Sequence, residues 1–380
     1  MQARQRLPLV VVQMALQAFL HLVETWLWPP ETSHADPLWH GRRVRLLDGT
    51  TFRMRPEGDL VESYGQASNQ QGAGYWVVAK SVAVFCLHTR LCLAYAEGPH
   101  TTSEPALATL VVRQDPVPGS VSVADRVFGV YRVVQVAQAA DQDVVVRLER
   151  RTARRLWCLG HTLTQWPGAR ECQVAWAPTP ATQVEPGLPP APVAGRLICA
   201  RLQRKGFRPL DLDLFTTLVS VDAYPLADLV ARYGLRWEVE LDYRHLKTTL
   251  EMETFAVQSA ALFRLELAVG VLTYNLVCAL MVKAAHTAEL SPMRLSFSRC
   301  LRRVRQALLH GLPTWLHEHD TVIHALLEQL ARCRLPQQPH KPQHEPRQVR
   351  RRPQVFPALR GAREEARQEL LARWSEGSIS

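Results

Sequence analysis

The chain has 380 residues, of which 47% are hydrophobic, so it is long and apolar enough for a substantial core in one large domain or two ordinary ones. Its formal net charge is +10, and only five of its 45 basic residues are Lys. This balance favours a nucleic acid or an anionic membrane as partner, although an arginine excess is also typical of GC-rich coding. The eight cysteines form no Cys-x-x-Cys pair, which argues against a zinc ribbon or a disulfide framework and favours the reducing cytoplasm.

Residues 1–40 contain an apolar segment, 7–27, followed by a connector with three prolines. The polar residues of this segment recur every three or four positions: Gln13, Gln17, His21 and Glu24. A polar stripe of this kind predicts an amphipathic helix and not a signal peptide.

Residues 41–148 alternate between strand and helix patterns. Strands are expected at residues 43–48, 51–55, 75–85, 87–95, 121–124 and 143–148. Helices are expected from a Ser103 cap to about Val112 and from about Phe128 to Ala139, and residues 58–74 are polar enough for a loop.

Two aspartates stand at strand ends in this region. Asp48 comes before Gly49, so a hairpin turn between two short strands is an alternative to a functional role. Asp125 follows a short apolar strand and precedes a loop and helix, where α/β folds place functional groups, although a helix cap is the simpler alternative. The residues alone leave both alternatives open.

Residues 149–224 are rich in Arg, Trp and Pro and carry strand patterns at 193–202 and 212–220. We interpret them as a β-rich insertion with a return strand. Three tryptophans stand out, although each is more typical of packing than of binding: Trp157, Trp166 and Trp176.

Residues 225–253 contain the strongest signal in the chain. No proline interrupts residues 233–247, and Pro225 suits the first turn of a helix. At about 100° per residue, four side chains of different chemistry fall within a sector of about 60°: Tyr233, Arg236, Glu240 and Lys247. Such a face suits phosphate chemistry, because a carboxylate holds a metal while Arg and Lys hold a polyanion. The alternative is a solvated amphipathic helix.

Residues 254–335 are predicted to be helical, and residues 336–380 form a Pro- and Arg-rich tail that is either solvated or contacts DNA. The uncharged stretch 267–282 is too short for a comfortable membrane span, so we expect a buried core helix.

The spacing Tyr-x2-Arg-x3-Glu-x6-Lys matches, at every position, the signature of bacterial DDE transposases of the insertion-sequence-four type. The Asp-Gly-Thr context of Asp48 and the Ala-Asp-Arg-Val-Phe-Gly context of Asp125 resemble the first and second catalytic motifs of that family. A β-rich insertion before the last core helix is also characteristic of these enzymes. The chain therefore resembles a transposase over most of its length.

This resemblance implies an α/β fold with a ribonuclease-H-like core, a β-rich insertion before the last core helix and a helical C-terminal region. It implies that the catalytic, metal-binding residues are Asp48, Asp125 and Glu240, and that Tyr233, Arg236, Lys247 and Arg126 contact DNA. Two Mg²⁺ ions, with Mn²⁺ as a substitute, would support hydrolysis at transposon ends and transfer of the 3′-hydroxyl to target DNA. A tryptophan of the insertion would stack on a flipped base.

The implied partners are the inverted-repeat ends, target DNA and a second copy of the chain in a synaptic dimer, with no membrane. Family members carry a longer N-terminal helical region, so we expect residues 1–40 to be a short or truncated DNA-binding segment. The alternatives are a decayed or N-terminally short relative that binds DNA without transposition, or another ribonuclease-H-like nuclease.

Overall fold

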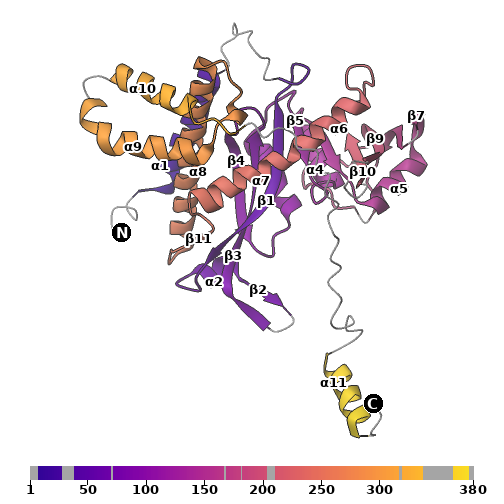
Figure 1. The fold of residues 1–380 in the computed structure, drawn as a ribbon. Helices are drawn as coiled ribbons and strands as arrows, with labels where there is room; N and C mark the ends of the chain where they lie inside the picture. Colours follow the sequence, from indigo (N-terminus) through magenta and orange to yellow (C-terminus); the bar gives the residue numbers. More distant parts are fainter. Residues whose placement is uncertain are drawn as a thin grey trace. The chain divides into compact units, whose positions relative to one another are not determined.

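The computed structural model describes residues 7–27, 38–69, 72–166, 168–180, 182–202, 210–315, 319–336 and 363–375, and Figure 1 shows their ribbon. The chain divides into two units. The larger comprises Met1–Leu202 and Leu210–Gln338, and the smaller is described only by helix α11 (Arg363–Ser375). The Arg-rich stretch from Arg347 to Arg360, in the tail that was expected either to be solvated or to contact DNA, lies outside the described residues.

The centre of the larger unit is strand β1 (Val44–Met54), which pairs antiparallel with β3 (Gly72–Cys86). Strand β3 pairs in turn with β4 (Cys92–Pro99), again antiparallel. The two strands expected at residues 43–48 and 51–55 are one continuous strand, which excludes the alternative of a hairpin turn at Asp48 and Gly49.

On its other side β1 pairs with the parallel strand β5 (Val121–Ala124), and β5 pairs with the parallel strand β6 (Asp143–Arg147). Helix α3 (Glu104–Gln114) connects β4 to β5, and α4 (Tyr131–Ala139) connects β5 to β6. Three antiparallel strands followed by two parallel strands with helical crossovers form the ribonuclease-H-like arrangement predicted from the sequence.

The two faces of this sheet bury different clusters, because successive residues of a strand point to opposite sides. Leu46 belongs to the cluster covered by α6 (Leu226–Gly234), α7 (Glu238–Arg244) and α8 (Ala260–Thr287). Leu47 belongs to the cluster covered by α3, α4 and the helix α5 (Arg150–Leu159). The four residues of β5 are all buried, as expected for a parallel strand with helices on both faces.

The insertion extends the core sheet instead of forming a sheet of its own. After helix α5 (Arg150–Leu159), strands β7 (His161–Trp166), β8 (Ala169–Trp176), β9 (Val193–Leu202) and β10 (Leu210–Thr216) follow along the chain. With β2 (Gln66–Asn69) at one end, the sheet order is β2-β3-β1-β5-β6-β10-β9-β8-β7, so β10 lies directly beside β6.

A fully buried ion pair joins this extension to the segment that leads into α6. The side chains of Arg196 on β9 and Glu171 on β8 are both 0% exposed. Arg196 Nη1 also lies 3.1, 2.8 and 2.9 Å from the carbonyl oxygens of Leu218, Ser220 and Tyr224, so the buried charge has polar partners besides Glu171.

The helix expected over residues 233–247 is interrupted twice. Helix α6 ends at Gly234, a 3₁₀ turn covers Leu235–Trp237, α7 follows, and a π turn covers His245–Thr249. The regular α-helical geometry assumed for residues 233–247 was therefore wrong in detail, although the segment is helical throughout. Strand β11 (Thr254–Phe255) then pairs parallel with β1.

Helix α8 packs against α1 (Leu9–Leu27), α9 (Phe297–Trp315) and α10 (His319–Ala331), as Figure 1 shows. Among the described residues, α8 is a helix long and apolar enough to cross a membrane by length and composition. Its Asn275 is buried, and the amide both accepts from the Cys92 N–H and donates to the Cys92 carbonyl, each at 2.8 Å. These bonds fix α8 to the start of β4 as a core helix.

Three elements that the following sentences name, within the described part of the chain, were not predicted. The stretch expected to be a loop, 58–74, contains helix α2 (Leu60–Tyr64) and strand β2 (Gln66–Asn69). Helix α5 stands where the Arg-rich start of the insertion carried no prediction. Strand β4 starts later than expected, at Cys92, because residues 87–90 form a turn in which Arg90 has a positive φ of 64°.

Candidate active site

Two carboxylates come from neighbouring parallel strands. The pairing of β1 with β5 ends at Leu47 and Ala124. Asp48, within β1, and Asp125, directly after β5, are the residues that follow this last pair. Asp48 Oδ1 accepts the N–H of Gly49 at 2.9 Å, and Asp125 Oδ1 accepts the N–H of Val127 at 2.8 Å. The strand register therefore places both aspartates at one edge of the sheet.

The turn after Asp125 depends on Gly129. A Cβ at that position would lie 2.0 Å from the carbonyl oxygen of Arg147, so only glycine lets this turn pack against the end of β6. This close approach keeps the loop that starts at Asp125 against the sheet edge.

Burial raises the pKa of Asp48 from its ordinary value of 3.8 to about 6. The hydrogen bond from Gly49 and the charge of Arg236 lower this pKa, while the negative charges of Asp125 and Glu240 raise it. Burial and the two neighbouring carboxylates therefore disfavour the charged form of Asp48.

Arg236 links Asp48 to the third predicted carboxylate. Its Nη2 lies 3.2 Å from Glu240 Oε1, one helical turn ahead, and its Nη1 lies 3.8 Å from Asp48 Oδ2. The arginine side chain is 9% exposed and its Cζ lies 4.4 Å from the centre of the Trp237 ring, whereas the Glu240 side chain is 49% exposed. Asp48 and Glu240 also line a shallow cavity of about 360 Å³, together with Lys247.

The remaining predicted contacts occupy different environments. Tyr233 is buried, and burial raises its pKa while the charges of Arg236 and Arg147 lower it. Lys247 lies in the π turn and its Nζ donates to Thr50 Oγ1 of β1 at 3.4 Å. Arg126 is exposed in the turn after Asp125. The four signature residues therefore differ in burial: Tyr233 and Arg236 are buried, whereas Glu240 is half exposed and lines the same cavity as Lys247.

The side of α7 that carries Asp242 is structural. Its buried carboxylate pairs with Arg90 at 2.6 Å and accepts the Tyr274 hydroxyl at 2.9 Å. Burial raises the pKa of Asp242 to about 6, while Arg90 lowers it. This pair fixes α7, and therefore Glu240, to the turn before β4 and to α8.

Three residues near the site were not predicted. Glu104, the first residue of α3, lies over Gly49, since a Cβ on Gly49 would be 2.9 Å from Glu104 Cδ. Burial raises the pKa of Glu104, the positive charge of Lys80 lowers it, and the negative charge of Asp125 raises it. Lys80, the second unpredicted residue, and Asp125 therefore both lie near the Glu104 carboxylate. Because these contacts join distant segments, no local pattern in the sequence could have shown them.

Tyr243 is the third unpredicted residue near the site. Its hydroxyl accepts the Ala83 N–H at 3.0 Å and donates to the Asp48 carbonyl at 2.7 Å. It holds β1 and β3 against α7 beside the carboxylates. The only sequence signal for it was its position three residues after Glu240 in the signature segment.

The donor chemistry of the three predicted carboxylates suits a divalent cation, because all are hard oxygen ligands and their charges crowd Asp48. Within the described part of the chain, however, no group of three or more His, Cys, Asp or Glu is gathered closely enough to hold a metal ion. The Glu240 carboxylate instead accepts a hydrogen bond from Arg236 at 3.2 Å.

The family model of the transposase DDE domain matches residues 39–276, which include every residue of this site. The chain belongs to the DDE transposases. A similar protein is the transposase InsG for insertion sequence element IS4 of Escherichia coli strain K12, with 25% identity over 328 residues. The alignment covers 81% of this chain and 66% of InsG, so this DDE transposase chain spans slightly less than two thirds of that relative.

These matches confirm the membership that the signature predicted, in the insertion-sequence-four type. Among solved structures, the synaptic complex of piggyBac transposase with hairpin DNA aligns at a TM-score of 0.41 and 9% identity, covering 78% of this chain and 58% of the other.

Proposed function

We propose that this chain is a DNA transposase that hydrolyses a phosphodiester at a transposon end and transfers the freed 3′-hydroxyl to target DNA. The observation that carries the proposal is that Asp48 on β1 and Asp125 directly after the adjacent strand β5 lie at matching positions, with Glu240 connected to Asp48 through Arg236. The family membership of residues 39–276 supports the same reaction.

The metal ligands in this proposal are Asp48, Asp125 and Glu240. Two Mg²⁺ ions, or Mn²⁺ in their place, would activate the attacking oxygen and stabilise the leaving oxygen of each displacement. The raised pKa of Asp48 supports this assignment, because neighbouring carboxylates and burial disfavour its charge until a cation is near.

The basic and phenolic groups around the carboxylates would hold DNA. Lys247 lies beside the cavity that Asp48 and Glu240 line, and its ammonium suits a phosphate next to the scissile bond. Arg126 is exposed for the same role on the Asp125 side. Arg236 and Tyr233 are buried, so we assign them to orienting the carboxylates and to the innermost phosphate.

The partners that we propose are the inverted-repeat ends of the element, target DNA and a second copy of the chain in a synaptic dimer, in the bacterial cytoplasm. We further propose that an insertion tryptophan stacks on a flipped base. Trp157 is half-buried, whereas Trp176 is buried and packs on Phe215 with ring centres 4.9 Å apart, which favours Trp157. The side chain of Trp166 lies outside the described residues.

The test is a joining assay with a labelled donor that carries both inverted repeats, an unlabelled target plasmid and Mg²⁺. Wild type should give donor–target joint molecules, Asp125→Asn should give none, and the matched variant Asp141→Asn, whose residue is exposed in a surface turn, should react as wild type does. Cleavage without joint molecules would instead identify a nuclease and would refute the proposal.

A further inference from the structure

Helix α5 concentrates positive charge where a helix tolerates it least. Four arginines fall within its first six residues, and its first turn holds no acidic residue. Cations near a helix N-terminus oppose the helix dipole, and the i, i+4 pairs Arg150–Arg154 and Arg151–Arg155 repel each other. All four are exposed, and none forms an ion pair within the described residues. The fold therefore keeps a charge cluster that costs stability.

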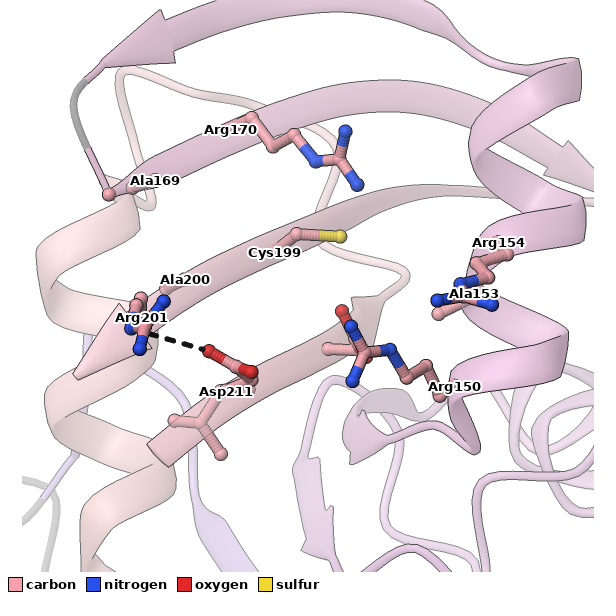
Figure 2. Close-up of a pocket in the computed structure, with 12 residues that line it drawn as sticks. Arg150, Ala153, Arg154, Ala169, Arg170, Cys199, Ala200, Arg201 and Asp211 are labelled. Atoms are coloured by element: carbon pink, nitrogen blue, oxygen red, sulfur yellow. Dashed lines mark ion pairs between the residues drawn. The ribbon is translucent and has the colours of Figure 1, made fainter. Parts of the chain in front are cut away.

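Two of these arginines line one wall of a cavity of about 440 Å³, as Figure 2 shows. Arg150 and Arg154 project from α5, and Arg170 on β8 and Arg201 on β9 line the facing strands. The acidic groups on the cavity wall are Asp211 and Asp213, so positive charge prevails by four to two.

The arginines on the strand side differ in how firmly they are held. The guanidinium carbon of Arg170 lies 4.2 Å from the ring centre of Trp157, a distance at which the ring fixes its orientation. Arg201 is 3.9 Å from Asp211, and both side chains are about 60% exposed, so this contact is weak and open to exchange. A bound anion could therefore contact Arg150, Arg154 and Arg170 without breaking any ion pair within the described residues. Contact with Arg201 would replace only its weak pair with Asp211.

The cavity opens at the same edge of the sheet as the predicted catalytic carboxylates. Asp125 follows β5, α5 starts three residues after β6 ends, and the residues of β10, β9 and β8 that line the cavity lie beyond β6 in the sheet order. With neighbouring strands about 4.8 Å apart, β10 to β8 lie about 10–19 Å from the strand of Asp125. One DNA strand advances about 3.4 Å per nucleotide, so this span corresponds to about three to six nucleotides.

We propose that this cavity binds a backbone phosphate of the transposon-end DNA, about three to six nucleotides from the scissile phosphodiester. The inference rests on the proposed function, because it takes the bound polyanion to be the substrate DNA. The guanidinium groups match a phosphodiester in charge and geometry, since each presents a planar fork of donors. The binding of DNA offsets the repulsion within α5.

The first experiment measures binding of a labelled end duplex to the full chain by fluorescence anisotropy, without divalent cation, over a range of salt concentrations. Arg150→Gln/Arg154→Gln and the single variant Arg170→Gln should each bind about five- to tenfold more weakly, with the salt slope reduced by about 0.9 per lost phosphate contact. A matched control, Arg302→Gln/Arg305→Gln, removes two exposed arginines of α9 and should leave both quantities unchanged.

Thermal unfolding separates this effect from damage to the fold. Without DNA, Arg150→Gln/Arg154→Gln should unfold at the wild-type temperature or above it, because the substitution removes like-charge repulsion in α5. The second experiment places a single neutral methylphosphonate at each position of the end duplex. A substitution about three to six nucleotides from the cleavage point should weaken wild-type binding and should add no further loss in the variant.

Additive losses from the DNA and the protein changes, or wild-type affinity in both arginine variants, would overturn the inference while leaving the proposed function intact. Stabilisation of wild type by inorganic phosphate, with end binding unchanged in the variants, would assign the cavity to a free anion and would also overturn it. A wild-type protein that binds no end duplex at all would remove the proposed function and this inference together.

Discussion

The substitution Asp48→Asn should stabilise the metal-free protein at neutral pH. The Asp48 side chain is only 17% exposed, and its pKa in the folded protein is about 6 against an ordinary 3.8. A raised pKa means that the protonated form favours folding, so this contribution is complete below about pH 4 and is lost as the pH rises through about 6. A difference of about two pKa units corresponds to about 3 kcal/mol against folding at pH 7.5.

Asparagine removes this charge and keeps an oxygen that can accept the Gly49 N–H. We therefore expect Asp48→Asn to raise the free energy of unfolding by about 1–3 kcal/mol at pH 7.5 and to leave it unchanged at pH 4. The assay is thermal unfolding in EDTA at both pH values, with Asp141→Asn as the matched control.

Addition of Mg²⁺ should reverse the order of the two proteins. A cation that binds only the folded wild type stabilises it by about 2.7 kcal/mol at a concentration a hundred times its dissociation constant, and the variant should gain far less. If Asp48→Asn destabilises the protein at pH 7.5 in EDTA, or shifts the unfolding temperature equally at both pH values, the charge crowding inferred around Asp48 is wrong.

Three further substitutions test other parts of the structure. Lys247→Ala should weaken binding of the end duplex and reduce the salt slope by about 0.9, and an unchanged slope would exclude its phosphate contact. Gly49→Ala places a Cβ 2.9 Å from Glu104 Cδ, at the end of a flexible side chain that can move, so it should cost at most about 1 kcal/mol in chemical denaturation. The cost should fall in the double variant with Glu104→Ala, and an equal cost there would show that Glu104 does not lie over Gly49. Arg196→Met leaves Glu171 buried without its partner and should cost about 3–5 kcal/mol, whereas Arg196→Met/Glu171→Leu should recover part of that loss; no recovery would mean that the carbonyl contacts of Arg196 dominate.

Local patterns were sufficient to predict the order of the core elements. The apolar run at 121–124 and the Ser103 cap appear in the structure as strand β5 and the start of α3, where Ser103 Oγ accepts the Ala106 N–H at 3.3 Å. Strand alternation and capping are properties of neighbouring residues, so the sequence carries them directly.

The continuous strand through Asp48 could not be predicted in this way. Asp-Gly is a strong turn signal, but pairing with β3 along nearly the whole of β1 outweighs it. The interrupted signature helix was not predictable either, because no local pattern in the sequence marks the 3₁₀ and π turns between the buried residues Tyr233, Arg236 and Asp242 and the end of the segment. Local preference predicts an element, and tertiary packing decides its exact path.

The candidate site shows the same limit. The signature named Glu240 and Lys247, and their separation in sequence suggested one helical face. The link through Arg236 to Asp48 and the approach of Glu104 join segments that are far apart in the chain, so only the folded structure reveals them.

The most direct test of the central claim is metal-dependent cleavage of a labelled duplex made from the inverted repeats that flank the gene. Wild type and Glu238→Gln, which changes a neighbouring carboxylate on α7, should cleave the duplex with Mg²⁺ and not in EDTA. Glu240→Gln should bind the duplex and not cleave it. Cleavage by Glu240→Gln at the wild-type rate, or wild-type cleavage that persists in EDTA, would contradict the assignment of Asp48, Asp125 and Glu240 as the metal-binding triad.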